Sequence, residues 1–171
     1  MDKYAQQVSD NKEVFNAVFE PFRQGRFKSM QDGQKAIKDL FITLQSVFDA
    51  KVDLRKYRQV FNDADRFGRV GLEWDSDGEP LDWYFDVKRN EGWIIGGRIV
   101  IPESAIKELD PTMILGAALE EYCHSLQEME GTRQSTGGLT TGVAHDITPS
   151  EIRANEFVFD VFDDFGFNIA T

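Results

Sequence analysis

The spacing of apolar residues changes twice along the chain, and these two changes restrict the possible folds more than any other feature of the sequence. Up to about residue 66, apolar residues recur every three or four positions, as on the buried face of a helix. Between residues 69 and 102 they alternate with polar residues, as in strands with one solvated face. Helical spacing returns after residue 110. This order predicts an α+β fold in one domain, residues 1–171, because 171 residues can enclose a single core.

Three amphipathic helices are predicted in the first third of the chain. The first covers residues 5–19 and ends before Pro21, since proline cannot donate the amide hydrogen bond of a helix interior. The second covers residues 37–48, and the pattern Ser29-x-x-Asp32 is typical of a helix cap upstream of it. The third is shorter and covers residues 54–64. The apolar faces of these helices indicate core packing and no chemistry.

The alternating middle of the chain predicts three strands, at residues 70–74, 81–87 and 93–101. The simplest connection is an antiparallel meander, in which each strand pairs with the next one along the chain. Gly96-Gly97 interrupts the last strand, and glycines inside a strand pattern are typical of a bulge. The expected sheet is therefore small and antiparallel.

Two helices are predicted at residues 110–130 and 148–165. Asp110 before Pro111 is typical of a helix start, and Thr148-x-x-Glu151 has the pattern of a capping box. The intervening residues 131–147 are rich in Gly, Ser and Thr and exceed the usual length of a connection. We expect them to be mobile, either as a lid or as slack.

The first of these two helices carries the most specific motif, Glu120-Glu121-x-x-His124. Residues four apart lie on the same face of a helix, so Glu120 and His124 point the same way, with Glu121 about 100° around. The metallopeptidase motif His-Glu-x-x-His has this layout: its two histidines hold zinc and its glutamate activates water. Here Glu120 stands in the place of the first histidine.

Three segments in order resemble a zincin-like metallopeptidase and are similar to the ImmA/IrrE-type peptidases. They are a strand ending at residues 99–102, the helix with Glu120-Glu121-x-x-His124-x-x-Gln127, and a helix that begins Glu151-Ile152-Arg153-Ala154-Asn155. The resemblance covers about residues 93–165. The helical N-terminal part, 1–66, lies outside the resemblance, and the zincin-like part of the domain is expected at 67–171. The resemblance implies that His124 and Glu151 bind metal, that Glu121 is the catalytic base, and that Glu120 occupies the first-ligand position.

The substitution at Glu120 changes the expected metal chemistry. Carboxylates do bind zinc, at about 2.0–2.2 Å. One histidine with two carboxylates is nevertheless a harder donor set, which favours Mn²⁺, Fe²⁺ or Mg²⁺ more than the usual set of two histidines and one glutamate does. The added negative charge makes the metal a poorer Lewis acid. The expected cofactor is therefore a divalent metal, Zn²⁺ or Mn²⁺/Fe²⁺, in a weakly active or inactive peptidase, that is, a pseudoenzyme.

Each residue of the motif also has an ordinary structural interpretation. Glu120 is typical of a solvated helix side chain. Glu121 and His124 have the spacing of an intrahelical pair worth about 0.3–0.5 kcal/mol. Glu151, at the third position of a capping box, can bond back to the amide of Thr148. These alternatives remain open at the level of sequence.

Three neighbouring residues carry weaker signals. Gln127, one turn after the histidine of the motif, can orient that histidine or have no role in the site. His145, in the long connection, can act as an accessory ligand but is more typical of an ordinary loop histidine. Cys123 is expected to pack as a small apolar residue, since its side chain points about 100° away from the neighbouring histidine.

The net charge of −11 constrains the partners. It argues against binding to nucleic acid or to an anionic membrane, because phosphate contacts need clustered Lys and Arg. The sequence has no apolar run of 18 residues and no signal-peptide pattern, and its single Cys suits a reducing cytoplasm. A protein or peptide is therefore the expected substrate or partner.

A second interpretation needs no catalysis. The C-terminal helix is acidic, with Glu156, Asp160, Asp163 and Asp164. Such a face is typical of a solvated surface, but it also suits an adaptor, immunity protein or inhibitor that presents carboxylates to a basic partner. Phe159 and Phe167 fall outside the apolar stripe of this helix and can form a small exposed patch or pack beneath the N-terminal helices.

Overall fold

The computed structural model describes residues 1–48, 51–56, 70–71, 81–89, 92–101, 103–130 and 148–167. It describes the side chains of residues 1–48, 106–127, 130 and 148–167. The elements in chain order are α1 (Lys3–Asp10), α2 (Lys12–Phe19), the 3-10 helix η1 (Glu20–Arg23), α3 (Met30–Val47), β1 (Lys51–Lys56), β2 (Val70–Gly71), β3 (Leu81–Arg89), β4 (Gly92–Ile101), α5 (Glu103–Glu108), α6 (Pro111–Glu130) and α8 (Pro149–Phe165).

The backbone of the four strands forms one sheet in the order β1-β3-β4-β2. The pairs β1–β3 and β3–β4 are antiparallel, whereas β2 runs parallel to β4. Phe85 pairs with Gly97 and the next residue, Asp86, pairs with Ile95, so the register skips Gly96. This is the place where the glycine pair predicts a bulge.

The predicted α+β class with a small antiparallel sheet is wrong. Among the residues whose side chains are described, 84% are helical and none lies in a strand. The strands traced in the backbone form a mixed sheet, because β2 lies at the edge beside β4 and not next to β3. Alternation with period two reports which face of a strand is apolar, but it specifies neither the neighbouring strand nor its direction.

The third predicted helix, 54–64, is also wrong where the structure describes it. Residues 54–56 belong to β1, and residues 57–64 lie outside the described part of the chain. The sequence of β1 is Lys-Val-Asp-Leu-Arg-Lys, in which Val52 and Leu54 alternate with charged residues. Over these six residues the period of two describes the chain better than the helical spacing. The segment predicted to be mobile, 131–147, lies outside the described residues.

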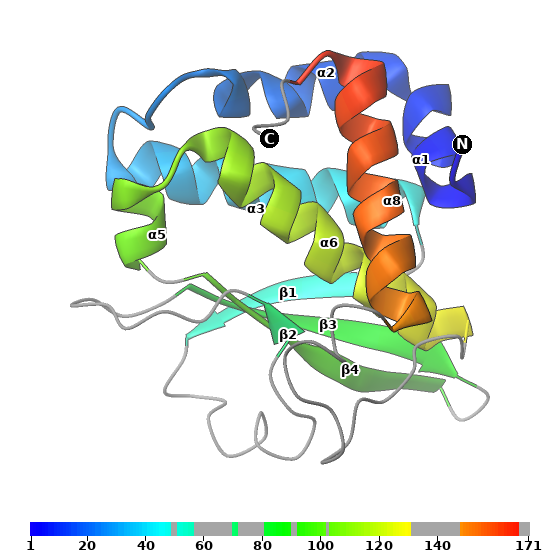
Figure 1. Cartoon of the computed structure of the whole chain (residues 1–171). Coiled ribbons are helices and arrows are strands. Elements are labelled where there is room, and N and C mark those ends of the chain that lie inside the picture. The colour runs from blue at the N-terminus through cyan, green and yellow to red at the C-terminus, as the bar shows by residue number, and fades with distance from the viewer. Residues whose placement is uncertain are drawn as a thin grey trace.

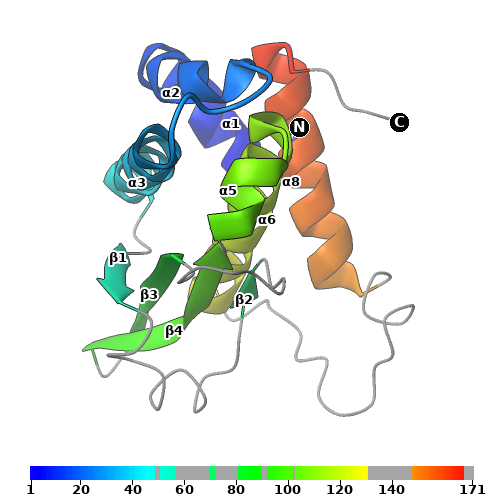
Figure 2. The same cartoon turned by 90° about the vertical axis from the view of Figure 1, so that its left-hand side faces the viewer.

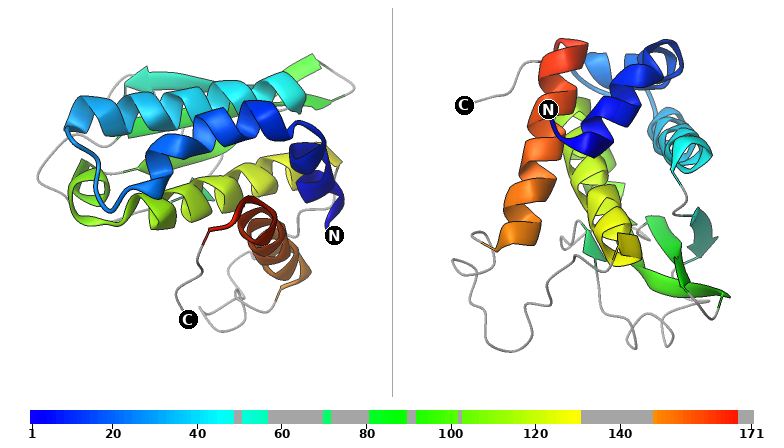
Figure 3. Two further views of the ribbon diagram at one scale, coloured as in Figure 1. Left: turned by 90° about the horizontal axis from the view of Figure 1, so that it is seen from above. Right: turned by 90° about the vertical axis from the view of Figure 1, so that its right-hand side faces the viewer.

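The helices lie on one side of the sheet (Figure 1). Helix α6 contacts β3, β4 and β2, and α3 reaches β1. Helices α1 and α2 lie on the side of α3 and α6 that is turned away from the sheet (Figures 1 and 2). Helix α8 packs against both α6 and α1, as the view from above also shows (Figure 3). The contact between α6 and α8 is the one that forms the candidate site.

An aromatic core joins the N-terminal helices to α6 and α8. The largest fully enclosed side chains are Tyr122, Phe15, Phe19, Phe22, Phe41 and Phe157. The rings of Phe19 and Phe165 meet edge to face at 4.9 Å, and Phe167 also packs on Phe19. Burying one such side chain stabilises the fold by about 1.5–3 kcal/mol. Phe167 is therefore part of the core, whereas Phe159 is exposed.

The helix ends follow local signals in the sequence. Ser29 accepts a hydrogen bond from the amide of Asp32 at 3.1 Å, which confirms the predicted cap of α3. The predicted helix over 5–19 is divided at Asn11, whose side chain donates to the carbonyl of Gln7 at 2.8 Å. Such local bonds compete with helix continuation. None of the described helices combines the length and the apolar character that a membrane span needs.

Candidate metal centre

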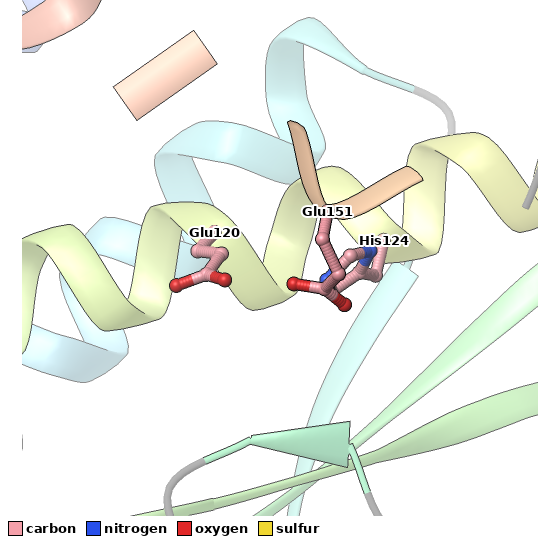
Figure 4. Close-up of side chains that lie close together, drawn as sticks. All are labelled: Glu120, His124 and Glu151. Atoms are coloured by element: carbon pink, nitrogen blue, oxygen red, sulfur yellow. The ribbon is translucent and has the colours of Figure 1, made fainter. Parts of the chain in front are cut away.

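Two helices bring three of the predicted ligands together. Glu120 and His124 lie one turn apart on α6, and Glu151 comes from the first turn of α8 (Figure 4). One ligand atom from each side chain lies within 4.8 Å of the other two. The three side chains lie on the side of α6 that faces the sheet (Figure 4). A buried group of this composition can hold a metal ion.

Burial makes this cluster different from a surface pair. His124 is 3% exposed and Glu151 7% exposed, and Glu120 is half-buried. A carboxylate removed from water needs a compensating positive charge or hydrogen bonds. The Nε2 atom of His124 lies 2.9 Å from a carboxylate oxygen of Glu151, so the two buried side chains compensate each other directly.

The capping box and the site share Glu151. Its amide donates to the hydroxyl of Thr148 at 3.4 Å, so Thr148 caps α8. The carboxylate of Glu151 lies against His124. The cap therefore does not carry the carboxylate away from the site, because the first turn of α8 points at α6.

The protonation equilibria reflect an excess of carboxylates. Burial raises the pKa of Glu120 to about 7, with further contributions from the charges of Glu121 and Glu151. Burial lowers the pKa of His124, but the hydrogen bond with Glu151 and the charge of Glu121 outweigh this, so that its pKa is raised overall. Both shifts mean that the cluster favours an added positive charge.

Glu121 and Cys123 lie between Glu120 and His124 in the sequence. Glu121 is half-buried, and its charge acts on both Glu120 and His124, so it lies within electrostatic reach of the site. Cys123 is fully buried, and burial raises the pKa of its thiol. A thiol that stays protonated is a poor nucleophile, and the expectation that Cys123 packs as an apolar residue agrees with this environment.

Gln127 links the two helices. Its side-chain oxygen is hydrogen-bonded to the Nδ1 atom of His124 at 2.8 Å, and its Nε2 donates a hydrogen bond to the backbone carbonyl of Ser150 at 2.9 Å. Sequence reasoning included Gln127 as an accessory residue but missed Ser150, because a backbone carbonyl leaves no signal in the residue type. His145, the other proposed accessory residue, lies outside the described residues.

The donor set fits a divalent metal. One imidazole and two carboxylates would provide three protein ligands, the number found in catalytic zinc sites, where a water or substrate completes the coordination. The two carboxylates make the set harder than two histidines with one glutamate.

Comparison with family models, with curated proteins and with solved structures found no match. The resemblance to zincin-like peptidases therefore rests on the motif residues alone.

Proposed function

We propose that this protein is a metal-dependent hydrolase of the zincin-like type that acts on peptide bonds. The observation that carries the proposal is the convergence of Glu120, His124 and Glu151 from two helices, largely removed from water. An intrahelical pair or a helix cap would not require all three to meet. The proposed metal ligands are these three residues, and the proposed base is Glu121.

Each residue then has a chemical role. A divalent metal supplies Lewis acidity, which polarises a carbonyl and makes a water molecule more acidic. Glu121 accepts the proton of the attacking water and returns it to the leaving amine. Glu120 adds negative charge at the ligand position where a histidine would be neutral, so we expect modest activity and a preference for Mn²⁺ or Fe²⁺ over Zn²⁺.

The acidic side chains of α8 bear on the non-catalytic alternative. Asp160 accepts a hydrogen bond from the amide of Asp2 at 2.7 Å, and Asp164 pairs with Lys12 at 3.3 Å. These two carboxylates therefore hold the N-terminal helices against α8, while Glu156 and Asp163 are exposed. Two exposed acidic side chains on α8 support a module that binds basic proteins less strongly than the convergence of Glu120, His124 and Glu151 supports a hydrolase.

The first test is metal binding. Elemental analysis of protein purified without chelator or metal-affinity resin should find a divalent metal. EDTA should lower the Tm, and Mn²⁺ or Zn²⁺ should restore it, because a ligand of the folded state stabilises that state by mass action. A protein without metal, whose Tm does not respond to divalent ions, would contradict the proposal.

The second test separates binding from catalysis. Glu121→Gln should keep the metal-dependent rise in Tm and lose peptide hydrolysis, since a base is not a ligand. His124→Ala should lose both. Glu156→Gln, an exposed change on α8, is the matched control and should alter neither property. Full hydrolysis by Glu121→Gln would remove Glu121 from the mechanism.

A further inference from the structure

Gln127 occupies the junction of the two helices that form the site. It lies on α6 one turn after His124, and its side chain is 1% exposed. One end of its amide contacts the His124 ring, and the other end contacts the first turn of α8 at Ser150. Burying an amide is unfavourable unless its hydrogen bonds are made, so both contacts matter for the fold.

The direction of the two hydrogen bonds follows from elementary chemistry. The carbonyl of Ser150 can only accept, so the amide group facing it is the Nε2 of Gln127. The oxygen of Gln127 must then face His124, and this oxygen can only accept. The Nδ1 atom of His124 therefore carries a hydrogen. The backbone of α8 thus determines where a hydrogen sits on a ring of α6.

This arrangement leaves Nε2 as the ring atom that faces the site. It lies 2.9 Å from the carboxylate of Glu151. A lone pair on Nε2 and a carboxylate oxygen repel each other at this distance, so a proton or a metal ion must lie between them. Metal-binding histidines commonly donate a hydrogen bond from the N–H of their other ring nitrogen in this way, which fixes the orientation of the ring.

We infer that Gln127 is a positioning residue for the site: it sets the hydrogen on Nδ1 of His124 and ties that ring to the turn that carries Glu151. Its role as a support for metal binding rests on the proposed function. The placement of the hydrogen on His124 does not rest on the proposed function, so the two roles of Gln127 can be tested separately.

Imidazole ¹⁵N NMR of metal-free protein tests the hydrogen placement. A His145→Asn background leaves His124 as the single histidine. We expect a proton bound to Nδ1 and protected from exchange. Gln127→Met should remove or broaden this signal because it removes both hydrogen bonds. Gln127→Glu should retain it, since a carboxyl group accepts from Nδ1 and its protonated oxygen can donate to Ser150.

The results of this measurement are decisive in either direction. A hydrogen on Nε2 alone in the parent protein, or an unchanged Nδ1 signal in Gln127→Met, would overturn the inference. If Gln127→Met does not fold, Gln127→Glu decides, because loss of its Nδ1 signal in a folded protein also contradicts the assignment.

Metal affinity provides the second readout. Competition with a chromophoric chelator should show Zn²⁺ and Mn²⁺ binding about 10–100-fold weaker in Gln127→Met, as for other residues that orient metal ligands. Gln127→Glu should remain close to the parent. Gln34→Met on α3, which contributes no residue to the site, is the matched control. If no variant binds metal, the proposed function fails, and the NMR result alone decides the role of Gln127. Equal affinities in the parent and Gln127→Met would contradict the support role.

Discussion

At the scale of single residues, Glu120 is the one that sets the character of the site. It takes the position that a histidine has in the zincin motif, and burial together with two neighbouring carboxylates raises its pKa to about 7. In the proposed metal site, this carboxylate would contribute charge as well as a ligand atom. That charge would offset part of the charge of a divalent metal and so reduce its Lewis acidity.

Replacing that residue by histidine is therefore an informative change. Glu120→His produces a donor set of two histidines and Glu151, which suits zinc better. We expect zinc affinity to rise by about tenfold or more, within the range that single changes around metal sites produce. Hydrolysis should rise as well. Competition with a chromophoric chelator measures the affinity, and Glu156→His on the exposed face of α8 is the control.

An unchanged zinc affinity in Glu120→His would show that position 120 does not contact the metal. The proposed metal site would then need a ligand other than residue 120 beside His124 and Glu151.

At the scale of elements, α8 begins at the candidate site and ends in a structural cap. Its first turn presents Glu151, and its last turn closes on Gly166, which has φ 73°. The amide of Phe167 donates to the carbonyl of Phe162 at 2.9 Å, and that of Gly166 to Asp163 at 3.4 Å. This is the Schellman arrangement, which satisfies the last carbonyls of a helix and favours glycine.

Gly166→Ala should destabilise the fold by about 1–2 kcal/mol, the cost of a side chain in the left-handed region. No atom lies within 4 Å of the added Cβ, so the effect is one of backbone conformation and not of packing. Urea unfolding measures it. Gly25→Ala is the matched control, because its Cβ also meets open space and its φ is not positive. Equal midpoints for the two variants would contradict the assignment.

At the scale of the whole molecule, an ion-pair network joins the N-terminal helix to the two helices of the site. Glu130 on α6 pairs with Lys3 at 2.6 Å and with Arg153 of α8 at 3.7 Å. Arg153 also approaches Asp2 at 3.6 Å and lies over the ring of Tyr4 at 4.8 Å. These interactions therefore hold together segments from the start, the middle and the end of the sequence.

This network predicts a pH dependence of stability. Burial raises the pKa of Glu130, but its bonds to Lys3 and Tyr4 and the nearby charges of Lys3 and Arg153 lower it overall. A carboxyl whose pKa is lower in the folded state stabilises the protein above its unfolded pKa of about 4.3 and loses this effect as the pH falls through the folded value.

Thermal melts from pH 7 to pH 3 should show Glu130→Gln less stable than the parent at neutral pH, with the difference disappearing in acid. High salt should reduce the difference at pH 7, since these groups are partly exposed. Lys3→Gln should show the same trend. A Tm difference that stays constant over the whole pH range would assign the effect of Glu130 to packing.

Local chemistry determined the two helices of the candidate site and their ends. Amphipathic spacing with Pro111 and the Thr148 cap predicted helices at 110–130 and 148–165, and the structure confirms them as α6 and α8. These signals act within a few residues, so the sequence alone contains them. The same reasoning placed Glu120 and His124 on one face, because a single helix determines that relation.

Tertiary structure decided how these elements meet. Whether Glu151 faces His124 depends on the packing of α8 against α6, and the link from Gln127 to the Ser150 carbonyl depends on the same contact. In the sheet, alternation indicated strands but not that β2 lies parallel to β4 at the edge. Residue patterns record which face is apolar. The way these faces and edges come together depends on the whole fold, because core packing and backbone hydrogen bonding must be satisfied at the same time.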